Sequence, residues 1–262
     1  MFLVGVIHKQ LTSHWFIRMH RLQIRNILIF VIFGFALSVA LIPYANAVVV
    51  SPVQIDLSLK APVGSFTVTN DSDVVLTYQS TALTWAQIDG QDVQVETQDL
   101  IVTPPIVSIK PKSAQVFRVA LFKPSKSLIE QSYRIILEDI STDVSQKAEN
   151  GLSFRFNHNL PIFYAPLRIT DLMIYSICES PAAGKSCVLI ENKGNRHAKI
   201  IQFTAASANL EEASTISKTI LAGSSSQWIF STMQGSENTS NIKLITNKGP
   251  LNLNLKDLPR SK

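Results

Sequence analysis

The sequence predicts an all-β protein built from two β-sandwich domains of the immunoglobulin-like kind. Beyond residue 47, nearly every apolar segment alternates with a period of two or is a short β-branched run. Turn-forming residues separate these segments, and none has the three-to-four spacing of an amphipathic helix. Short strands at regular spacing, with turns between them, are typical of a β-sandwich. About 215 residues follow residue 47, which is enough for two such domains of about 100 residues each.

The first 47 residues have the composition of a secretory signal peptide. The apolar run Asn26–Ala47 ends in Ala-Asn-Ala, a small-x-small cleavage sequence. It follows three arginines: Arg18, Arg21 and Arg25. These features predict that residues 1–47 are cleaved after export and that the mature chain begins at Val48. The alternative is an uncleaved membrane anchor, since the run is close to the length of a membrane span.

The net charge of the mature chain differs from that of the whole sequence. Met19 opens a stretch of ordinary signal-peptide length, so we interpret residues 1–18 as an upstream start. The sequence has 24 Lys and Arg against 19 Asp and Glu, and four of the basic residues precede Val48 with no acidic ones. Subtracting those four leaves 20 basic against 19 acidic residues. This balance gives no support for a nucleic-acid partner, and we expect no membrane attachment after cleavage.

The first domain is predicted to span residues 48–165 and the second to span residues 166–262. In the first, the pair Asp89–Gly90 predicts a hairpin turn. The expected strand segments of the first domain are 48–59, 64–70, 74–85, 93–96, 100–110, 115–122, 132–140 and 150–166. Those of the second domain are 187–205, interrupted by an Asn-Lys-Gly-Asn turn, then 224–230, 241–247 and 250–255.

The segment 150–166 is predicted to be one long strand with an apolar face. From Leu152 to Tyr164 the even-numbered residues are apolar except for His158, and the odd-numbered residues from 153 to 159 are polar. The even-numbered residues are Leu152, Phe154, Phe156, His158, Leu160, Ile162 and Tyr164. Successive side chains of a strand point to opposite faces, so these share one face. That face belongs either to the protein's own core, which the pattern alone favours, or to a binding surface.

Two cysteines, Cys178 and Cys187, lie in the sequence CESPAAGKSC. In an exported chain, a loop of this kind between two cysteines predicts a hairpin closed by a disulfide. The alternative is a zinc site that also uses His158 and His197, but the spacing does not resemble a set of four ligands.

The sequence offers no arrangement of residues typical of an enzyme. His158 and His197 do not lie near a recognisable nucleophile motif. Glu138 and Asp139 are adjacent in a predicted strand, so they point to opposite faces and cannot share acid–base work. No phosphate-binding glycine loop is present. We therefore expect no catalytic residues, no metal and no cofactor.

Arg118 and Arg134 lie among apolar residues of two predicted strands. Each alone is compatible with an outward-facing residue of a half-buried strand. A guanidinium in a partly desolvated cleft would also bind a carboxylate through two parallel hydrogen bonds.

Six segments follow one another in an order shared with a known family. They are VVVSPVQIDLS, FTVTNDSDVVLTYQSTALTW, LIVTPPIVSIKPKSAQVFRVAL, EQSYRIILEDI, LSFRFNHNLPIFYAP and LIENKGNRHAKI. In this order the mature chain resembles the periplasmic chaperones of chaperone–usher pilus assembly. The resemblance implies two immunoglobulin-like domains in a boomerang arrangement, with a cleft between them.

The resemblance also implies a role for the long strand. In the family, this strand donates alternating apolar side chains to a pilus subunit whose own sandwich lacks its final strand. The matching positions are Leu152, Phe154 and Phe156, followed by His158 and Leu160. Burying the first three side chains would contribute roughly 1.5–3 kcal/mol each, and a lent strand would cover exposed strand edges that otherwise aggregate. No ATP is needed for such binding.

The implied partners are pilus subunits and an outer-membrane usher, and the implied location is the periplasm. A dimer in which two free chaperones cover each other's donor strands is a further possibility. The alternative function is a structural subunit or adhesin of a surface fibre. Such a subunit would carry a donor extension before its first strand, whereas Val48 leads directly into the first predicted strand.

The chain departs from many family members at two positions. An arginine in the first strand and a lysine in the long strand commonly anchor the subunit's terminal carboxylate, but Gln54 and Pro161 stand there. In this respect the chain is more similar to the alternative or archaic branch. The resemblance therefore points to Arg134 as the main carboxylate anchor, with Arg118 as a second. Because Pro161 has no N–H for a ladder hydrogen bond, we expect strand lending to stop near Leu160.

Overall fold

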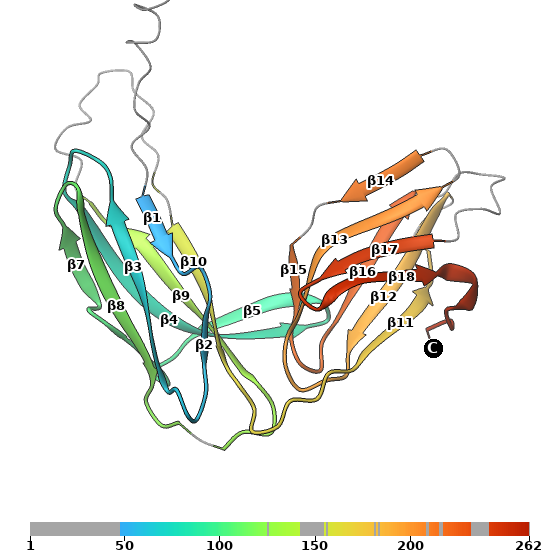
Figure 1. The fold of residues 1–262 in the computed structure, drawn as a ribbon, viewed down its shortest axis with the longest axis horizontal. Coiled ribbons are helices and arrows are strands. Elements are labelled where there is room, and N and C mark those ends of the chain that lie inside the picture. Colours follow the sequence, from blue (N-terminus) through green and yellow to red (C-terminus); the bar gives the residue numbers. More distant parts are fainter. Residues whose placement is uncertain are drawn as a thin grey trace, which may run out of the picture. The chain divides into compact units, whose positions relative to one another are not determined.

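The structure is a computed structural model, and it is almost entirely β-structure (Figure 1). It describes residues 48–124, 126–141, 155, 157–180, 182, 184–207, 210–214, 217–231 and 241–261. The predicted signal peptide, residues 1–47, lies outside this part, as do the predicted donor residues Leu152, Phe154 and Phe156. Among the described residues, no helix has the length and apolarity of a membrane span.

One layer of the first sandwich is a four-stranded sheet with the strand order β1, β3, β8, β6. Its strands are β1 (Val48–Ser51), β3 (Val63–Asn70), β8 (Ser113–Leu121) and β6 (Leu100–Thr103). Alternate residues point inward; in β3, these are Phe66, Val68 and Asn70. Phe66 stacks on Phe117 of β8, with 4.9 Å between ring centroids. The period-two pattern of the sequence thus describes one buried and one outer face.

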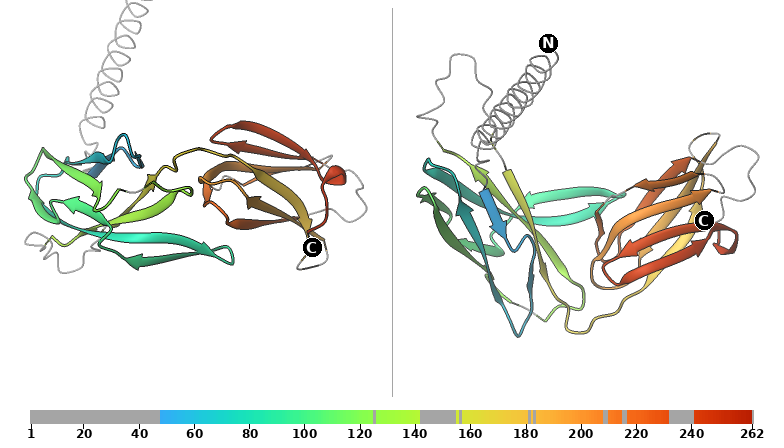
Figure 2. Two further views of the ribbon diagram at one scale, coloured as in Figure 1. Left: turned by 90° about the horizontal axis from the view of Figure 1, so that it is seen from below. Right: turned by 45° about the horizontal axis from the view of Figure 1, so that its top comes forward.

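The second layer is a six-stranded sheet. Its strands lie in the order β2, β10, β9, β4, β5, and β7 also pairs with β4. They are β2 (Ile55–Leu57), β10 (Asn157–Tyr164), β9 (Gln131–Asp139), β4 (Leu76–Ile88), β5 (Gln91–Glu96) and β7 (Ile106–Ile109). Only β2 and β10 run parallel to each other in this sheet. Because β9 pairs with β4 no further than Thr84, β4 and β5 continue beyond it as a two-stranded hairpin (Figure 2).

Two segments expected to be single strands are divided between the two layers. Residues 48–59 form β1 in one sheet and β2 in the other, with Pro52 between them. Residues 100–110 form β6 and β7, again in different sheets, with Pro104 and Pro105 between them. Proline has no N–H to give to a ladder, so it ends a strand at both places.

The hairpin predicted at Asp89–Gly90 is confirmed. It joins β4 to β5, and both turn residues have a positive φ, +50° and +75°. A two-residue turn of type I′ requires positive φ at both central positions, and this requirement explains the Asp-Gly pair.

The second sandwich consists of a three-stranded sheet and a five-stranded sheet. The first has the order β11 (Met173–Cys178), β12 (Lys185–Asn192) and β16 (Ser225–Ser231). The second has the order β14 (Leu210–Ser214), β13 (Ala198–Ser207), β17 (Asn241–Thr246) and β18 (Gly249–Asn254), with β15 (Lys218–Ile220) also on β13. The described part of the chain has one short 3₁₀ helix, η1 (Leu255–Asp257), after which Arg260 bridges to Ile177 of β11.

Each sandwich has its own hydrophobic core, and the predicted fold class is confirmed. The first core joins side chains of both layers, among them Phe117 and Ile135, and the second does the same with Ile190 and Leu244. The predicted disulfide between Cys178 and Cys187 is present at a paired position of β11 and β12. The disulfide consumes both thiols, and the described residues contain no cluster of side chains suited to a metal ion.

Candidate functional site

Strand β10 has an edge that is only partly covered. On one side it pairs with β9 along its full length, from Asn157 opposite Glu138 to Tyr164 opposite Gln131. On the other side it pairs with β2 only from Ile162 onward. Within the described residues, the stretch 157–161 therefore has no strand on its second side. An edge of this kind presents backbone N–H and C=O groups to which another strand can be added.

The apolar face of β10 belongs to the protein's own core from Leu160 onward. Leu160, Ile162 and Tyr164 are 3%, 0% and 1% exposed and lie in the first core. Leu160 was expected to be the last donor residue, but its side chain packs inside the sandwich, opposite Ile135. A donor surface on this face would therefore have to lie before Leu160.

His158 is the second residue of β10 and lies on the same face as Leu160. Its ring is half-buried and tilted toward Tyr78, with 6.3 Å between ring centroids. Its Nε2 atom is buried and has no hydrogen-bond partner among the described residues. Burial lowers the pKa of His158, despite the opposing charge of Asp139. At neutral pH the imidazole is therefore uncharged, and His158 contributes a polar but neutral ring at this position.

Arg134 lies on the outer face of the second layer, away from the core. Its neighbours in β9, Tyr133 and Ile135, are buried in the core, so alternation places Arg134 on the opposite face. It pairs with Pro161 of β10 on one side and with Leu83 of β4 on the other. Directly paired residues share a face, with Cβ atoms about 4.5–5.5 Å apart. The register thus brings Arg134 next to the position where the family resemblance expects a lysine.

The guanidinium of Arg134 is held by an aromatic ring and one amide. Its Cζ atom lies 3.6 Å from the centroid of the Trp85 ring, and its Nη1 donates to Oδ1 of Asn159 over 3.3 Å. Its Nε atom is buried without an acceptor among the described residues. Burial lowers the pKa of Arg134, and the nearby charge of Asp92 opposes this. An arginine retains its charge at neutral pH even so.

Gln54 lies beside Pro161, on the opposite side of β10 from Arg134. It directly precedes β2, whose first residue, Ile55, pairs with Ile162, so Gln54 comes level with Pro161. Its Nε2 donates to both carboxylate oxygens of Asp56, over 3.0 and 3.2 Å. The two positions that hold basic residues in many family members are thus neighbours here, and neither carries a cation.

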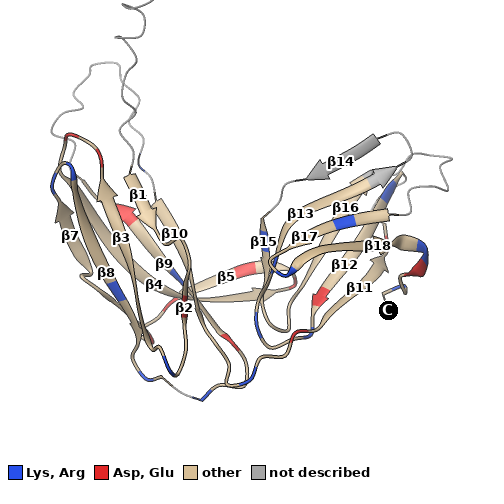
Figure 3. Cartoon of the chain, viewed as in Figure 1, with Lys and Arg blue, Asp and Glu red and all other residues tan. Residues whose placement is uncertain are grey.

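Arg118 lies in the opposite layer from Arg134. It is an exposed residue of β8, paired with Ser65 of β3 and Thr103 of β6. Arg118 and Arg134 are the only basic residues of β8 and β9, so the blue segments on these strands in Figure 3 mark them. Both point outward from the sandwich, on its two opposite faces. Arg118, which the resemblance suggests as a second anchor, therefore does not share a site with Arg134.

A third, smaller apolar cluster joins the first sandwich to the second. It consists of Trp85, Phe163 and Leu221, which are 4%, 2% and 5% exposed. Phe163 also stacks on His197, with 3.6 Å between ring centroids. The Nδ1 atom of His197 lies 2.8 Å from Oε1 of Glu130, and its backbone N–H donates to the same oxygen. His197 therefore has a structural role at this junction.

The turn between β12 and β13 is hydrogen-bonded to the segment that connects the sandwiches and to a loop of the first sandwich. Oδ1 of Asn195 accepts the N–H of Thr170, and its Nδ2 donates to the carbonyls of Leu128 and Arg168. These bonds tie the connection between the sandwiches, at Arg168 and Thr170, and the loop between β8 and β9, at Leu128, to one side chain. The segment LIENKGNRHAKI, which carries part of the family resemblance, thus contains the side chain that hydrogen-bonds to the connection between the sandwiches.

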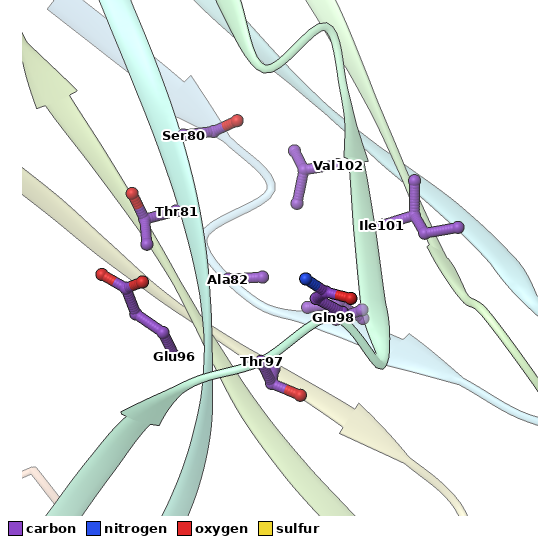
Figure 4. Close-up of a pocket in the computed structure, with 9 residues that line it drawn as sticks. Ser80, Thr81, Ala82, Glu96, Thr97, Gln98, Ile101 and Val102 are labelled. Atoms are coloured by element: carbon purple, nitrogen blue, oxygen red, sulfur yellow. The ribbon is translucent and has the colours of Figure 1, made fainter.

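A hollow of about 520 Å³ lies beside β4 and the segment 96–102. Figure 4 shows its lining, in which Ser80 and Ala82 point toward Val102 and Gln98, whereas Thr81 points to the other side of β4. Glu96 is the only charged residue lining it, and Arg134 and Trp85 do not take part. The hollow therefore lacks the cation that a carboxylate ligand needs.

Sequence reasoning singled out Arg134 but missed Trp85, the ring against which it lies. The sequence showed a tryptophan at the end of an alternating segment, yet the pairing of β4 with β9 was needed to bring the two together. In β4, Tyr78 faces the first core and Trp85 faces the opposite side. Counting alternate residues from Tyr78 would have placed Trp85 on the outer face, where a buried tryptophan needs a partner.

The first sandwich matches a known family model. Residues 47–170 match the family model described as pili and flagellar-assembly chaperone, PapD N-terminal domain. Comparison with curated proteins gives no match.

Solved structures share the fold across both sandwiches. A chain of the CsuC–CsuE chaperone–tip adhesion subunit pre-assembly complex, from archaic chaperone–usher Csu pili of Acinetobacter baumannii, is 16% identical with a TM-score of 0.62; the match covers 82% of this chain and 100% of that one. The CupB2 chaperone of Pseudomonas aeruginosa is 13% identical with a TM-score of 0.55, covering 79% and 100%. A chain of the Salmonella enterica SafA pilin–SafB chaperone complex is 12% identical with a TM-score of 0.54, covering 82% and 99%.

Proposed function

Residues 47–170 match the model of the pili and flagellar-assembly chaperone family, and from this match we propose that the protein is a periplasmic chaperone for pilus subunits. It binds a subunit by lending part of its long strand to the subunit's incomplete sandwich. It then delivers the subunit to an outer-membrane usher. No catalytic step and no ATP are required, because the binding energy comes from strand pairing and apolar burial.

The observation that carries this proposal is the uncovered edge of β10. Residues 157–161 are held by β9 on one side and have no strand on the other within the described part of the chain. The side chains immediately before this stretch, Leu152, Phe154 and Phe156, continue the alternating apolar pattern. Leu160 already fills the protein's own core. The lent segment therefore comprises the residues before Leu160, with Phe154 at its centre.

The proposed carboxylate anchor is Arg134 alone. It lies on the outer face of the same sheet, directly beside Pro161 of β10. A subunit strand added to the edge of β10 would bring its end within reach of a long, charged side chain on that face. Guanidinium groups bind carboxylates through two parallel hydrogen bonds, which would fix the register of the added strand.

The first test is co-purification from the periplasm of the native host. The protein, tagged at its C-terminus, is expected to bring down a small β-rich protein in a one-to-one complex, identified by mass spectrometry. Phe154→Asp should abolish capture, since a carboxylate buried in an apolar groove is strongly unfavourable. Ile229→Asp is the matched control: Ile229 is 53% exposed on β16 of the second sandwich, and the same charge there should leave capture intact.

Two results would overturn the proposal. If Phe154→Asp unfolds the purified protein, Phe154 belongs to the protein's own core rather than to a donor surface. If the wild-type protein emerges alone when the neighbouring reading frames are expressed with it, the family fold is present without the proposed function.

A further inference from the structure

The ring under Arg134 is held in place from both sandwiches. Trp85 lies at the point where β4 leaves β9 and continues into the hairpin with β5. On one side, the ring of Trp85 packs against Phe163 of β10, with 5.8 Å between the ring centroids. Leu221, from the loop after β15 in the second sandwich, completes the cluster. Trp85 is therefore a buried ring that depends on a residue of the other sandwich.

Hydrogen bonds from the same strand fix that dependence. Gln87 lies two residues after Trp85 in β4, on the same face. Its Oε1 accepts the backbone N–H of Leu221 over 2.9 Å, and its Nε2 donates to the carbonyl of Thr219 over 2.9 Å. Both groups of one amide are thus used to keep the loop that carries Leu221 against β4. The ring of Trp85 has little freedom to turn away.

Two buried N–H groups in this stack have no acceptor among the described residues. They are Nε1 of Trp85 and Nε of Arg134. Buried donors are nearly always hydrogen-bonded in folded proteins, so unpaired ones need an explanation. Both donors occur in the two side chains that face each other, which is consistent with a site whose acceptor arrives with a partner.

We propose that Trp85 is the positioning residue of the carboxylate site, and that Leu221 acts through it. Trp85 holds the guanidinium of Arg134 over a desolvated aromatic face, so that the cation is ordered before the carboxylate arrives. A free arginine side chain would lose its rotational freedom on binding, whereas a stacked one has already lost it. The identity of the ligand rests on the proposed function; the ordering of Arg134 by Trp85 does not.

The binding half of the test uses two synthetic peptides. Both copy the last strand of the subunit that co-purifies with the protein, one ending in a free carboxylate and the other in an amide. The wild-type protein should prefer the free acid. Trp85→Leu is expected to reduce that preference about tenfold, and Trp85→Phe, which retains an aromatic face, should reduce it less than about threefold. Leu221→Ala should lower the preference in the same direction as Trp85→Leu.

Trp228 provides the matched control. It is a buried tryptophan, 6% exposed, in the core of the second sandwich, and the Nζ atom of Lys218 lies 5.5 Å from its ring. Trp228→Leu should lower stability about as much as Trp85→Leu does, because both remove a large buried ring. It should leave the ratio of the two peptide affinities unchanged. A general loss of stability is thereby separated from a loss of carboxylate recognition.

The structural half of the test needs no ligand. In the free protein, the Nε–H signal of Arg134, assigned by its absence in Arg134→Lys, should show a ring-current shift and slow exchange with solvent. Trp85→Leu should remove both features. If Trp85→Leu leaves this signal unchanged, or retains the full preference for the free acid, the inference is wrong. It is also wrong if Trp85→Phe behaves like Trp85→Leu, because the aromatic face is then not what orders the cation.

The two levels of proposal fail in different ways. If wild-type protein binds neither peptide, the proposed function is overturned, and the Nε–H signal alone decides whether Trp85 orders Arg134. If wild-type protein prefers the free acid and the variants do so equally, the chaperone function stands and the role of Trp85 is rejected.

Discussion

Replacing Asn70 should destabilise the first sandwich more than any ordinary surface change. Asn70 ends β3 and is completely buried. Its Nδ2 donates to the carbonyls of Val74, Ile109 and Lys110, over 2.8, 3.0 and 3.2 Å. Its Oδ1 accepts the backbone N–H of Ser72 over 3.0 Å and also its hydroxyl. One amide thus closes the loop after β3 and joins it to the end of β7.

The expected loss of stability depends on which of these groups water can hydrogen-bond to once the Asn70 side chain is removed. In Asn70→Ala, the bond to Ile109 is the buried one, so its carbonyl loses a partner where water does not replace it. The remaining groups are only part-buried. An unsatisfied buried group costs about 1–3 kcal/mol, and each ordinary bond lost adds about 0.5–1.5 kcal/mol. We expect a loss of about 3 kcal/mol in the free energy of unfolding, and a fall of about 15 °C in the melting temperature of this sandwich.

The assay is urea unfolding of the chain that begins at Val48, with hydrogen exchange to locate the change. Asn192→Ala is the matched control, because Asn192 is 2% exposed at the equivalent turn of the second sandwich. Its Nδ2 donates to the carbonyls of Arg196 and Ile220. Asn70→Ala should weaken protection in β3 and β7, and Asn192→Ala in β12. A loss below about 1 kcal/mol for Asn70→Ala would refute the assignment of these bonds as major stabilising contacts.

Two further predictions concern the connection between the sandwiches. Hydrogen bonds from Arg196 and Lys248 lower the pKa of Asp171 to about 2, so the unfolded chain takes up the proton first as the pH falls. This ionised carboxylate contributes about 1 kcal/mol of stability after screening, because its side chain is 35% exposed. The contribution is complete above about pH 4 and is lost toward pH 2. Thermal melting across this range should therefore show the melting temperatures of Asp171→Asn and wild type converge as the pH falls. Gly194→Ala should destabilise the protein by about 1–3 kcal/mol in urea unfolding, because its Cβ would lie 2.5 Å from the carbonyl oxygen of Thr170; an unchanged midpoint would show that this turn can move aside.

Alternation in the sequence predicted the strands but could not assign them to sheets. In 48–59 and 100–110 the inward-facing residues change from even to odd numbers at the prolines, and each segment supplies one strand to each layer. A period of two says which side chains point inward, and both layers have their inward side chains in the same core. The prolines within these segments were the available signal for the division, since proline interrupts a ladder.

The same limit applies to the two arginines that the resemblance suggests as anchors. Arg118 and Arg134 have the same local pattern, a single arginine among apolar residues, and both point outward. Only the pairing of β9 with β10 distinguishes them, because it puts Arg134 beside Pro161. For Leu160 the sequence pattern was continuous with the predicted donor residues, and only the core of the first sandwich shows where the protein's own face begins.

The register of β9 and β10 also gives a physical reason why the chain can do without the basic residues that many family members carry. A side chain on the neighbouring strand, on the same face, begins only about 4.5–5.5 Å from the position that it replaces, and arginine is long enough to span that distance. A cation on β9 instead of β10 also lies against Trp85, with 3.6 Å between Cζ of Arg134 and the ring centroid. A lysine at position 161 would not need this ring. Proline at 161 then has no unfavourable effect on carboxylate binding. Because proline has no N–H, it also ends the pairing with an added strand next to Arg134. A comparison made one position at a time would count Gln54 and Pro161 as two lost anchors, whereas cross-strand pairing places the proposed anchor, Arg134, on the neighbouring strand.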